Sequence, residues 1–286
     1  MYENIVVAYD GSESSKAALI ESVNWVKKHS GKVSLVHAVY FNEEELTMAP
    51  EQREMRFEQG KKLCYQTREM ASSELGIDVE TLVCEGDPPE VVADIARERS
   101  ADLIAMGTHG RKGLKRLLMG SVTREVIIKS PCDVLVVKRS CSDCTGQFLS
   151  ILVPFDGSDL SKKALDRACR IAGPDNSEVT VLYVIPRYEE MMEFFRTEAI
   201  EKGLVHEAKK ILSAAAEEIS QGLGISVKTR IEEGNAADKV LEISQKLETD
   251  LIVMGTHGWT GVNKAILGST TERVITNATR PILVVR

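Results

Sequence analysis

The chain has 286 residues, and its 36 basic against 43 acidic side chains give a formal net charge of −7. This length suits one large domain or two of ordinary size, and the acidic balance argues against a nucleic-acid or anionic-membrane surface. No apolar run approaches the roughly 18 to 20 residues that cross a bilayer, and the apolar strand predicted from residue 4 leaves no room for an export signal. We therefore expect a cytoplasmic protein that binds neither nucleic acid nor membranes.

Short apolar runs alternate with charged or amphipathic segments along the first half of the chain. The apolar, β-branched runs predict buried strands, and the segments between them predict helices. The predicted strands span residues 4–9, 32–39, 79–84, 102–106 and 131–137. The first predicted helix ends near residue 28, and the other three span residues 51–75, 90–99 and 121–129. This alternation implies an α/β fold with a mostly parallel sheet between helices. The ligand crevice is expected at the carboxyl ends of the strands.

A polar segment without periodicity, residues 139–147, separates this half from a second half that repeats it. We predict a first domain over residues 1–138 and a second over residues 148–286. The linker carries Cys141 and Cys144 in a C-x-x-C spacing. Because the nearby sequence offers no second pair of zinc ligands, we interpret them as solvent-exposed thiols, with a redox or metal role as the alternative.

A glycine motif recurs in the two halves with the same internal spacing. It reads Gly-Thr-His-Gly, nine residues, Gly-Ser, and occupies residues 107–121 and 255–269. Glycines remove Cβ atoms where backbone N–H groups must face a ligand, and the helix that starts at the end of the motif adds unpaired N–H donors. Tight turns also use glycine for steric reasons, but two copies that each follow an apolar run favour phosphate binding.

A second pair of matching segments ends the first strand of each half: Val-Ala-Tyr-Asp-Gly-Ser at residues 7–12 and Val-Pro-Phe-Asp-Gly-Ser at residues 153–158. With the duplicated glycine motif, the chain resembles the universal stress protein family in its tandem-domain form, over essentially all of its length apart from the linker. The resemblance implies two open, parallel five-stranded sheets in the order 3-2-1-4-5, flanked by helices. This is the Rossmann-like fold of the adenine nucleotide alpha hydrolase class, and the ATP-binding members of the family carry the same glycine pattern.

The resemblance also implies which residues bind ATP. The phosphates and ribose are assigned to the motif residues Gly107, Gly110, Gly120 and Ser121 in the first half and Gly255, Gly258, Gly268 and Ser269 in the second. The nucleoside is expected beside Asp10 and Asp156, and adenine beside the backbone of Ala38 and Val184, which are matched by strand alignment. Considered without the resemblance, the two serines could instead cap their helices. The two aspartates could serve as turn residues or hold a Mg²⁺ that accompanies the triphosphate.

The expected function is that of an ATP-binding regulatory protein of a stress response. Bound ATP would order the two glycine loops and change a surface that an unknown protein partner recognises, with at most slow hydrolysis. We assign no catalytic residue and no metal ligand, because no nucleophile with a partner acid recurs beside His109 and His257, and no Walker A motif is present. Two alternatives stay open: a nucleotide hydrolase or transferase that uses the same crevice, and an interaction module that needs no nucleotide. The apolar residues 191–195 could contact a partner or cover their own sheet.

Two further expectations concern the halves as a pair. Because single-domain relatives pair through their last strands, the resemblance implies that residues 134–137 and 281–285 lie against one another as an intramolecular pseudo-dimer, and a further homodimer stays open.

The first glycine loop carries four cationic residues where the second carries only Lys264, and Glu272 stands three residues after Ser269 in the spacing of a capping box. A carboxylate there would compete with phosphate for the helix start. We therefore expect the first half to bind ATP the more tightly, by about tenfold.

Overall fold

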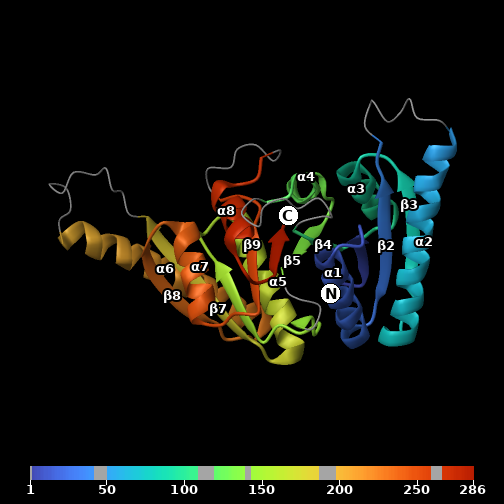
Figure 1. The fold of residues 1–286 in the computed structure, drawn as a ribbon. Helices are drawn as coiled ribbons and strands as arrows, with labels where there is room; N and C mark the ends of the chain where they lie inside the picture. Colours follow the sequence, from blue (N-terminus) through green and yellow to red (C-terminus); the bar gives the residue numbers. More distant parts are fainter. Residues whose placement is uncertain (1, 42–49, 109–118, 139–142, 187–197, 259–265) are drawn as a thin grey trace. The chain divides into compact units, whose positions relative to one another are not determined.

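The computed structural model of the chain describes residues 2–41, 50–108, 119–138, 143–186, 198–258 and 266–286. The apolar residues 191–195 lie outside these ranges. The chain divides into two compact units, Met1–Gln147 and Phe148–Arg286, and Figure 1 shows the strands and helices of both. Among the described residues, no helix is long and apolar enough to span a membrane.

The first unit alternates strands with helices, as the sequence predicts (Figure 1). Its strands are β1 (Asn4–Ala8), β2 (Lys32–Val39), β3 (Glu80–Glu85), β4 (Leu103–Gly107) and β5 (Asp133–Val137). Its helices are α1 (Glu13–His29), α2 (Pro50–Leu75), α3 (Pro88–Glu98) and α4 (Ser121–Lys129). The strands are parallel and lie in the order β3-β2-β1-β4-β5. This order confirms the predicted 3-2-1-4-5 topology.

The second unit repeats this plan. Its strands are β6 (Ser150–Pro154), β7 (Glu178–Pro186), β8 (Lys228–Gly234), β9 (Leu251–Gly255) and β10 (Ile282–Val285). Its helices are α5 (Asp159–Asp175), α6 (Glu198–Leu223), α7 (Ala236–Lys246) and α8 (Ser269–Asn277). The parallel order β8-β7-β6-β9-β10 is the same as in the first unit.

Helices cover both faces of each sheet, which explains why the central strands are apolar throughout. In β1, Ile5, Val6 and Val7 are each at most 1% exposed. In the first unit α1 packs with α2, and α3 packs with α4. Right-handed crossovers place these two pairs on opposite faces of the sheet. The carboxyl ends of β1, β2 and β4 therefore meet at one edge of the sheet, where the Asp-Gly-Ser turn and the glycine motif begin.

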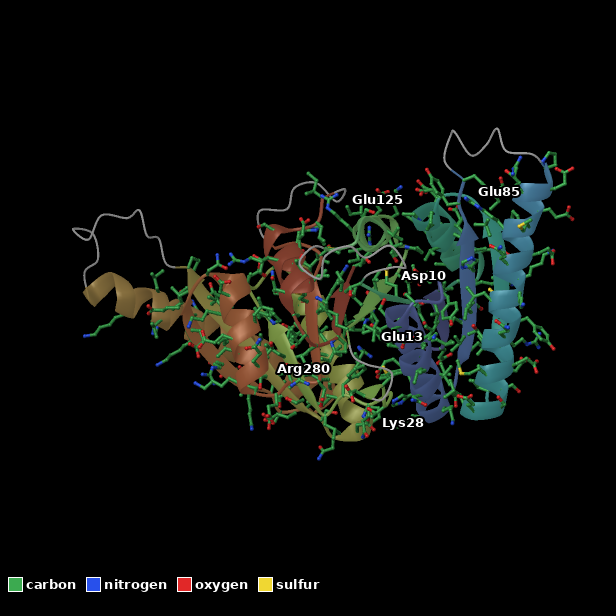
Figure 2. The ribbon with its side chains drawn as sticks, in the orientation of Figure 1. Asp10, Glu13, Lys28, Glu85, Glu125 and Arg280 are labelled. Carbon is green, nitrogen blue, oxygen red and sulfur yellow. The ribbon has the colours of Figure 1, made fainter. Side chains whose placement is uncertain are left out.

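The charges of α1 agree with its direction. Glu13 lies in its first turn and Lys28 in its last turn, and Figure 2 labels both side chains at opposite ends of the helix. An acidic group near the N-terminus and a basic group near the C-terminus interact favourably with the helix dipole. The N-terminus of α1 is thus fixed at the edge of the sheet that carries the turn.

Helix α3 starts two residues earlier than the sequence predicts. Asp87 is its N-cap and Pro88 its first residue, whereas the prediction began the helix at Glu90. Proline is favourable at the first helical position, because the N–H that it lacks would have no intrahelical partner and its φ is already helical. The Gly-Asp-Pro segment is therefore both a turn and a helix start.

The linker corrects the expectation of two exposed thiols. Cys144 is only 4% exposed, while Cys141 lies outside the described residues. Asn24 Nδ2 of α1 donates a hydrogen bond to the Cys144 carbonyl oxygen at 2.7 Å, and the N–H of Gly146 donates to Glu21 Oε1 at 3.0 Å. The polar composition was misleading because α1 side chains satisfy the backbone groups of this segment. The end of the linker is therefore part of the first unit.

Candidate functional site

The turn after β1 is built around Asp10. Its Oδ1 accepts hydrogen bonds from the N–H of Ser12 at 3.0 Å and from Ser12 Oγ at 2.6 Å. Gly11 adopts a φ of 80°, in the left-handed region that favours glycine. Ser12 is also the N-cap of α1, and its Oγ accepts from the N–H of Ser15 at 3.3 Å. Asp10 thus has the role of a turn residue, and the turn holds its carboxylate at the edge of the sheet.

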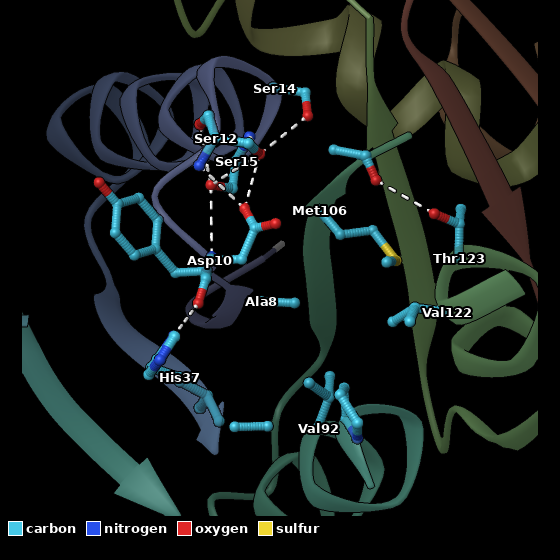
Figure 3. A pocket seen from close by; sticks show the side chains of 15 residues that line it. Ala8, Asp10, Ser12, Ser14, Ser15, His37, Val92, Met106, Val122 and Thr123 are labelled. Carbon is cyan, nitrogen blue, oxygen red and sulfur yellow. Dashed lines mark hydrogen bonds between the residues drawn. The ribbon is translucent and has the colours of Figure 1, made fainter. Parts of the chain in front are cut away.

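A cavity of about 180 Å³ opens at this edge of the first unit (Figure 3). It lies between the ends of β1, β2 and β4 and the starts of α1, α3 and α4. Three predicted site residues line it together: Asp10, Ala38 and Gly107. Sequence reasoning missed the other lining side chains, among them Ser12, Ser14, His37, Val92, Met106 and Val122. His37, Met106 and Val122 stand directly next to predicted positions in the chain, and Ser12 belongs to the repeated Asp-Gly-Ser segment. Ser14 and Val92 carried no such signal.

The cavity has an apolar part and a polar part. Val92 and Met106 supply apolar surface, and Asp10 and the serines of the first turn of α1 supply oxygens. His37 Nδ1 lies 2.8 Å from the carbonyl oxygen of Tyr9. Because a carbonyl oxygen only accepts, Nδ1 carries the proton, and this bond ties β2 to the turn that bears Asp10. Apolar walls with a few fixed polar groups are typical of small-molecule sites.

Helix α4 begins beside the cavity, with Gly120 as its N-cap and Ser121 as its first residue. Gly120 has no side chain with which to cap the first N–H groups of this helix. Thr123 Oγ1 donates to the carbonyl oxygen of Gly107 at 3.2 Å, which ties α4 to the end of β4. The uncapped N–H groups and the positive end of the helix dipole can bind an anion. Gly110 lies outside the described residues.

The described motif glycines allow close packing rather than a left-handed backbone, since none of them has a positive φ. A Cβ on Gly107 would lie 2.4 Å from Ser14 Oγ, and a Cβ on Gly255 would lie 2.7 Å from Leu160 Cβ. Real Cβ atoms do not approach neighbours this closely. The steric use of glycine that the sequence left open therefore applies at the ends of β4 and β9.

The second unit repeats the turn. Asp156 Oδ1 accepts from the N–H of Ser158 at 2.9 Å and from Ser158 Oγ at 2.6 Å. A Cβ on Gly258 would lie 2.2 Å from Asp156 Oδ2, so these two predicted site residues are in close proximity. Val184 of β7 pairs with β8 at the position where Ala38 of β2 pairs with β3. Both predicted adenine positions therefore lie at equivalent places in their sheets.

The predicted capping box at α8 is wrong. It required Ser269 to be the N-cap, but Gly268 occupies that position and Ser269 is the first residue of the helix. Glu272 is therefore one residue too far along the helix for the capping-box bond. In the loop before this helix, His257 Nδ1 lies 3.0 Å from Oγ1 of the neighbouring Thr256.

No group of three or more histidine, cysteine, aspartate or glutamate side chains that could hold a metal ion occurs in the described ranges. One carboxylate, Asp10, lines the cavity, and the start of α4 beside it can bind an anion.

A parallel doubly wound sheet with a cavity at the carboxyl ends of its strands defines a Rossmann-like α/β fold. Residues 1–138 and residues 147–286 each match the universal stress protein family, and the chain belongs to this family. The duplicated family match explains why the two units share one topology.

Three known proteins illustrate the similarity. A universal stress protein of Methanocaldococcus jannaschii is 36% identical over 150 residues, which are 49% of this chain and 82% of that protein. The crystal structure of a universal stress protein from Archaeoglobus fulgidus covers 99% of this chain and 98% of its own, with 22% identity and a TM-score of 0.73. A universal stress protein solved in complex with cAMP covers 49% of this chain and 97% of its own, with 23% identity and a TM-score of 0.40.

Proposed function

We propose that the chain is an ATP-binding universal stress protein that acts as a nucleotide-dependent regulator of a stress response. The observation that carries the proposal is the cavity of the first unit, which Asp10, Ala38 and Gly107 line together. Adenine would lie against its apolar part near Ala38. The phosphates would extend from Gly107 toward the N-terminus of α4, with Mg²⁺ accompanying the triphosphate.

Slow or absent hydrolysis is part of the proposal. Asp10, the carboxylate of the cavity, is engaged by the N–H and hydroxyl of Ser12 in the turn, which is the geometry of a structural aspartate rather than of a general base held ready for water. Bound nucleotide would then act by ordering the crevice and changing the surface around it.

Val122 allows binding to be tested separately from folding. It lies in the first turn of α4, lines the cavity and is 37% exposed. A glutamate at this position is favourable for the helix dipole but repels a polyphosphate. We expect Val122→Glu to keep the fold and to weaken ATP binding by about tenfold, with a smaller effect at high salt.

Isothermal titration calorimetry of the full chain with ATP, GTP and cAMP measures this effect. Thr270→Glu places the same charge at the corresponding position of α8 in the second unit and serves as the matched control. The proposal predicts that ATP binds the wild type, that GTP binds more weakly, and that Val122→Glu has a larger effect than Thr270→Glu. Absence of ATP binding to the wild type would refute it.

The same samples test the enzymatic alternative. Product formation by the full chain with ATP and Mg²⁺ is followed by chromatography over hours. A regulatory protein releases at most a few molecules of product per chain in that time, whereas many turnovers per minute would replace the regulatory role with an enzymatic one.

A further inference from the structure

The first turns of α1 and α5 have the same backbone arrangement but differ at one position beside the crevice. In both, the N-cap serine donates to the preceding aspartate: Ser12 Oγ to Asp10 Oδ1 at 2.6 Å, and Ser158 Oγ to Asp156 Oδ1 at 2.6 Å. Two residues after the N-cap, the first unit has a serine, Ser14, and the second has a leucine, Leu160. The turns can therefore be compared atom for atom.

Ser14 lines the cavity of the first unit (Figure 3). Its Oγ lies 3.2 Å from Ser12 Oγ, and a Cβ on Gly107 would lie 2.4 Å from it. The hydroxyl therefore sits against the last residue of β4, where the glycine motif starts. A ligand oxygen at this end of the cavity would meet a group that both donates and accepts hydrogen bonds.

Leu160 occupies the same place in the second unit, because a Cβ on Gly255 would lie 2.7 Å from Leu160 Cβ. Its side chain offers no hydrogen bond and is larger than that of serine. A phosphate or sugar oxygen placed there would lose its water without gaining a partner, which is unfavourable.

A second observation concerns the aspartate of the turn in the second unit; Gly110, the first-unit residue that corresponds to Gly258, lies outside the described residues. In the first unit Asp10 lines the cavity. In the second unit Gly258 of the glycine loop lies so close to Asp156 that its Cβ would be 2.2 Å from Asp156 Oδ2. Gly258 thus lies against the carboxylate that a nucleoside would have to reach.

From the exchange of Ser14 for Leu160 and the contact of Gly258 with Asp156 we infer that the chain binds one nucleotide, in the first unit, and that Ser14 contacts its phosphate or ribose oxygens. Leu160 and the approach of Gly258 to Asp156 exclude nucleotide from the second crevice. This inference rests on the proposed function. It adds the number of nucleotides bound per chain and a residue, Ser14, that contacts the bound nucleotide. It rests on the residues that contact Gly107, Gly255 and Gly258, and not on the loop charges from which the sequence predicts unequal affinities.

The test is a calorimetric titration of ATP with Mg²⁺ into the full chain. The wild type should show one site. Ser14→Leu should weaken binding by at least about tenfold, and Ser14→Ala, which removes only the hydroxyl, by about threefold to tenfold. The alanine variant keeps the test valid if leucine disturbs the fold, and circular dichroism checks the fold of each variant.

Two matched controls accompany these variants. Ser73→Leu makes the same substitution on the exposed side of α2, and Leu160→Ser changes the second crevice; neither should weaken the single site. Two sites of similar affinity in the wild type, or unchanged affinity in both Ser14 variants, would overturn the inference and leave the proposed function intact. A wild type that binds no ATP would overturn both.

Discussion

Because Gly107 has no side chain, the end of β4 packs closely against the start of α1. A Cβ on Gly107 would lie 2.4 Å from Ser14 Oγ and 2.7 Å from the carbonyl carbon of Ser14. Because α1 packs against the sheet, its backbone cannot move away without losing this packing. The glycine therefore sets the distance between the end of β4 and the start of α1, and with it the width of the cavity between them.

Gly107→Ala should destabilise the first unit by about 1 to 3 kcal/mol, because the added methyl overpacks this contact. Gly222 in α6 is the matched control, since a Cβ there meets nothing within 4 Å. Gly222→Ala should stabilise the protein by about 0.5 kcal/mol through helix propensity. Urea unfolding followed by circular dichroism measures both, and equal effects would show that the close contact does not matter.

Two buried thiols give the stability a defined dependence on pH. Burial raises the pKa of Cys64 from 9.0 to about 11 and the pKa of Cys169 from 9.0 to about 12. The unfolded chain therefore releases these protons first as the pH rises. Their contribution is fully present below pH 9 and is lost as the pH rises through 11 and 12.

The double variant Cys64→Ala with Cys169→Ala isolates this effect from other groups that titrate at high pH. Its free energy of unfolding should fall less than that of the wild type between pH 8 and pH 10.5. If urea unfolding gives the same decrease for both proteins, the buried thiols do not cause the alkaline sensitivity.

At the scale of elements, the end of the linker belongs to α1. Gly146 has a φ of 64°, and a Cβ on it would lie 2.3 Å from the carbonyl carbon of Asn24. Its N–H is bonded to the buried Glu21. Residues 143–147 are therefore attached to the first unit by steric fit as well as by hydrogen bonds.

Gly146→Ala should release this segment, whereas Gly224→Ala should not. Gly224 has a similar φ of 68°, but a Cβ there meets nothing within 4 Å, so its replacement costs only about 1 to 2 kcal/mol of backbone strain. Hydrogen exchange measures the outcome: amide protection around residue 146 should fall only in Gly146→Ala. Equal protection in the two variants would mean that the packing on α1 does not hold the linker.

The elements also show what a sequence can and cannot predict. The strand order followed from the motif resemblance, and the meeting of Asp10, Ala38 and Gly107 at one edge follows from parallel strands with right-handed crossovers. Val92 could not be identified as a lining residue, because it lies inside a helix whose apolar residues look alike until the helix is placed on the sheet. Similarly, the N-cap of α8 could not be chosen between Gly268 and Ser269 by composition alone, since both are accepted at that position.

At the scale of the whole molecule, two units with their own sheets and cores share one chain. Within its unit, β5 pairs with β4, and β10 pairs with β9. Each is the last strand of its unit's sheet, and such strands are normally covered. The pairing of last strands implied by the family resemblance stays a prediction.

Separate expression of residues 1–147 and 148–286 tests it. Mixed at equal concentration, the two fragments should form a 1:1 complex in size-exclusion chromatography with light scattering. Fragments that stay folded and monomeric after mixing would contradict the pairing.

The central claim is that the cavity of the first unit holds an adenine nucleotide. Native mass spectrometry of the freshly purified full chain, before and after addition of ATP and Mg²⁺, tests it most directly. We predict a mass increase that corresponds to one nucleotide per chain and that Val122→Glu reduces. A spectrum that shows the bare chain at every ATP concentration would contradict the claim.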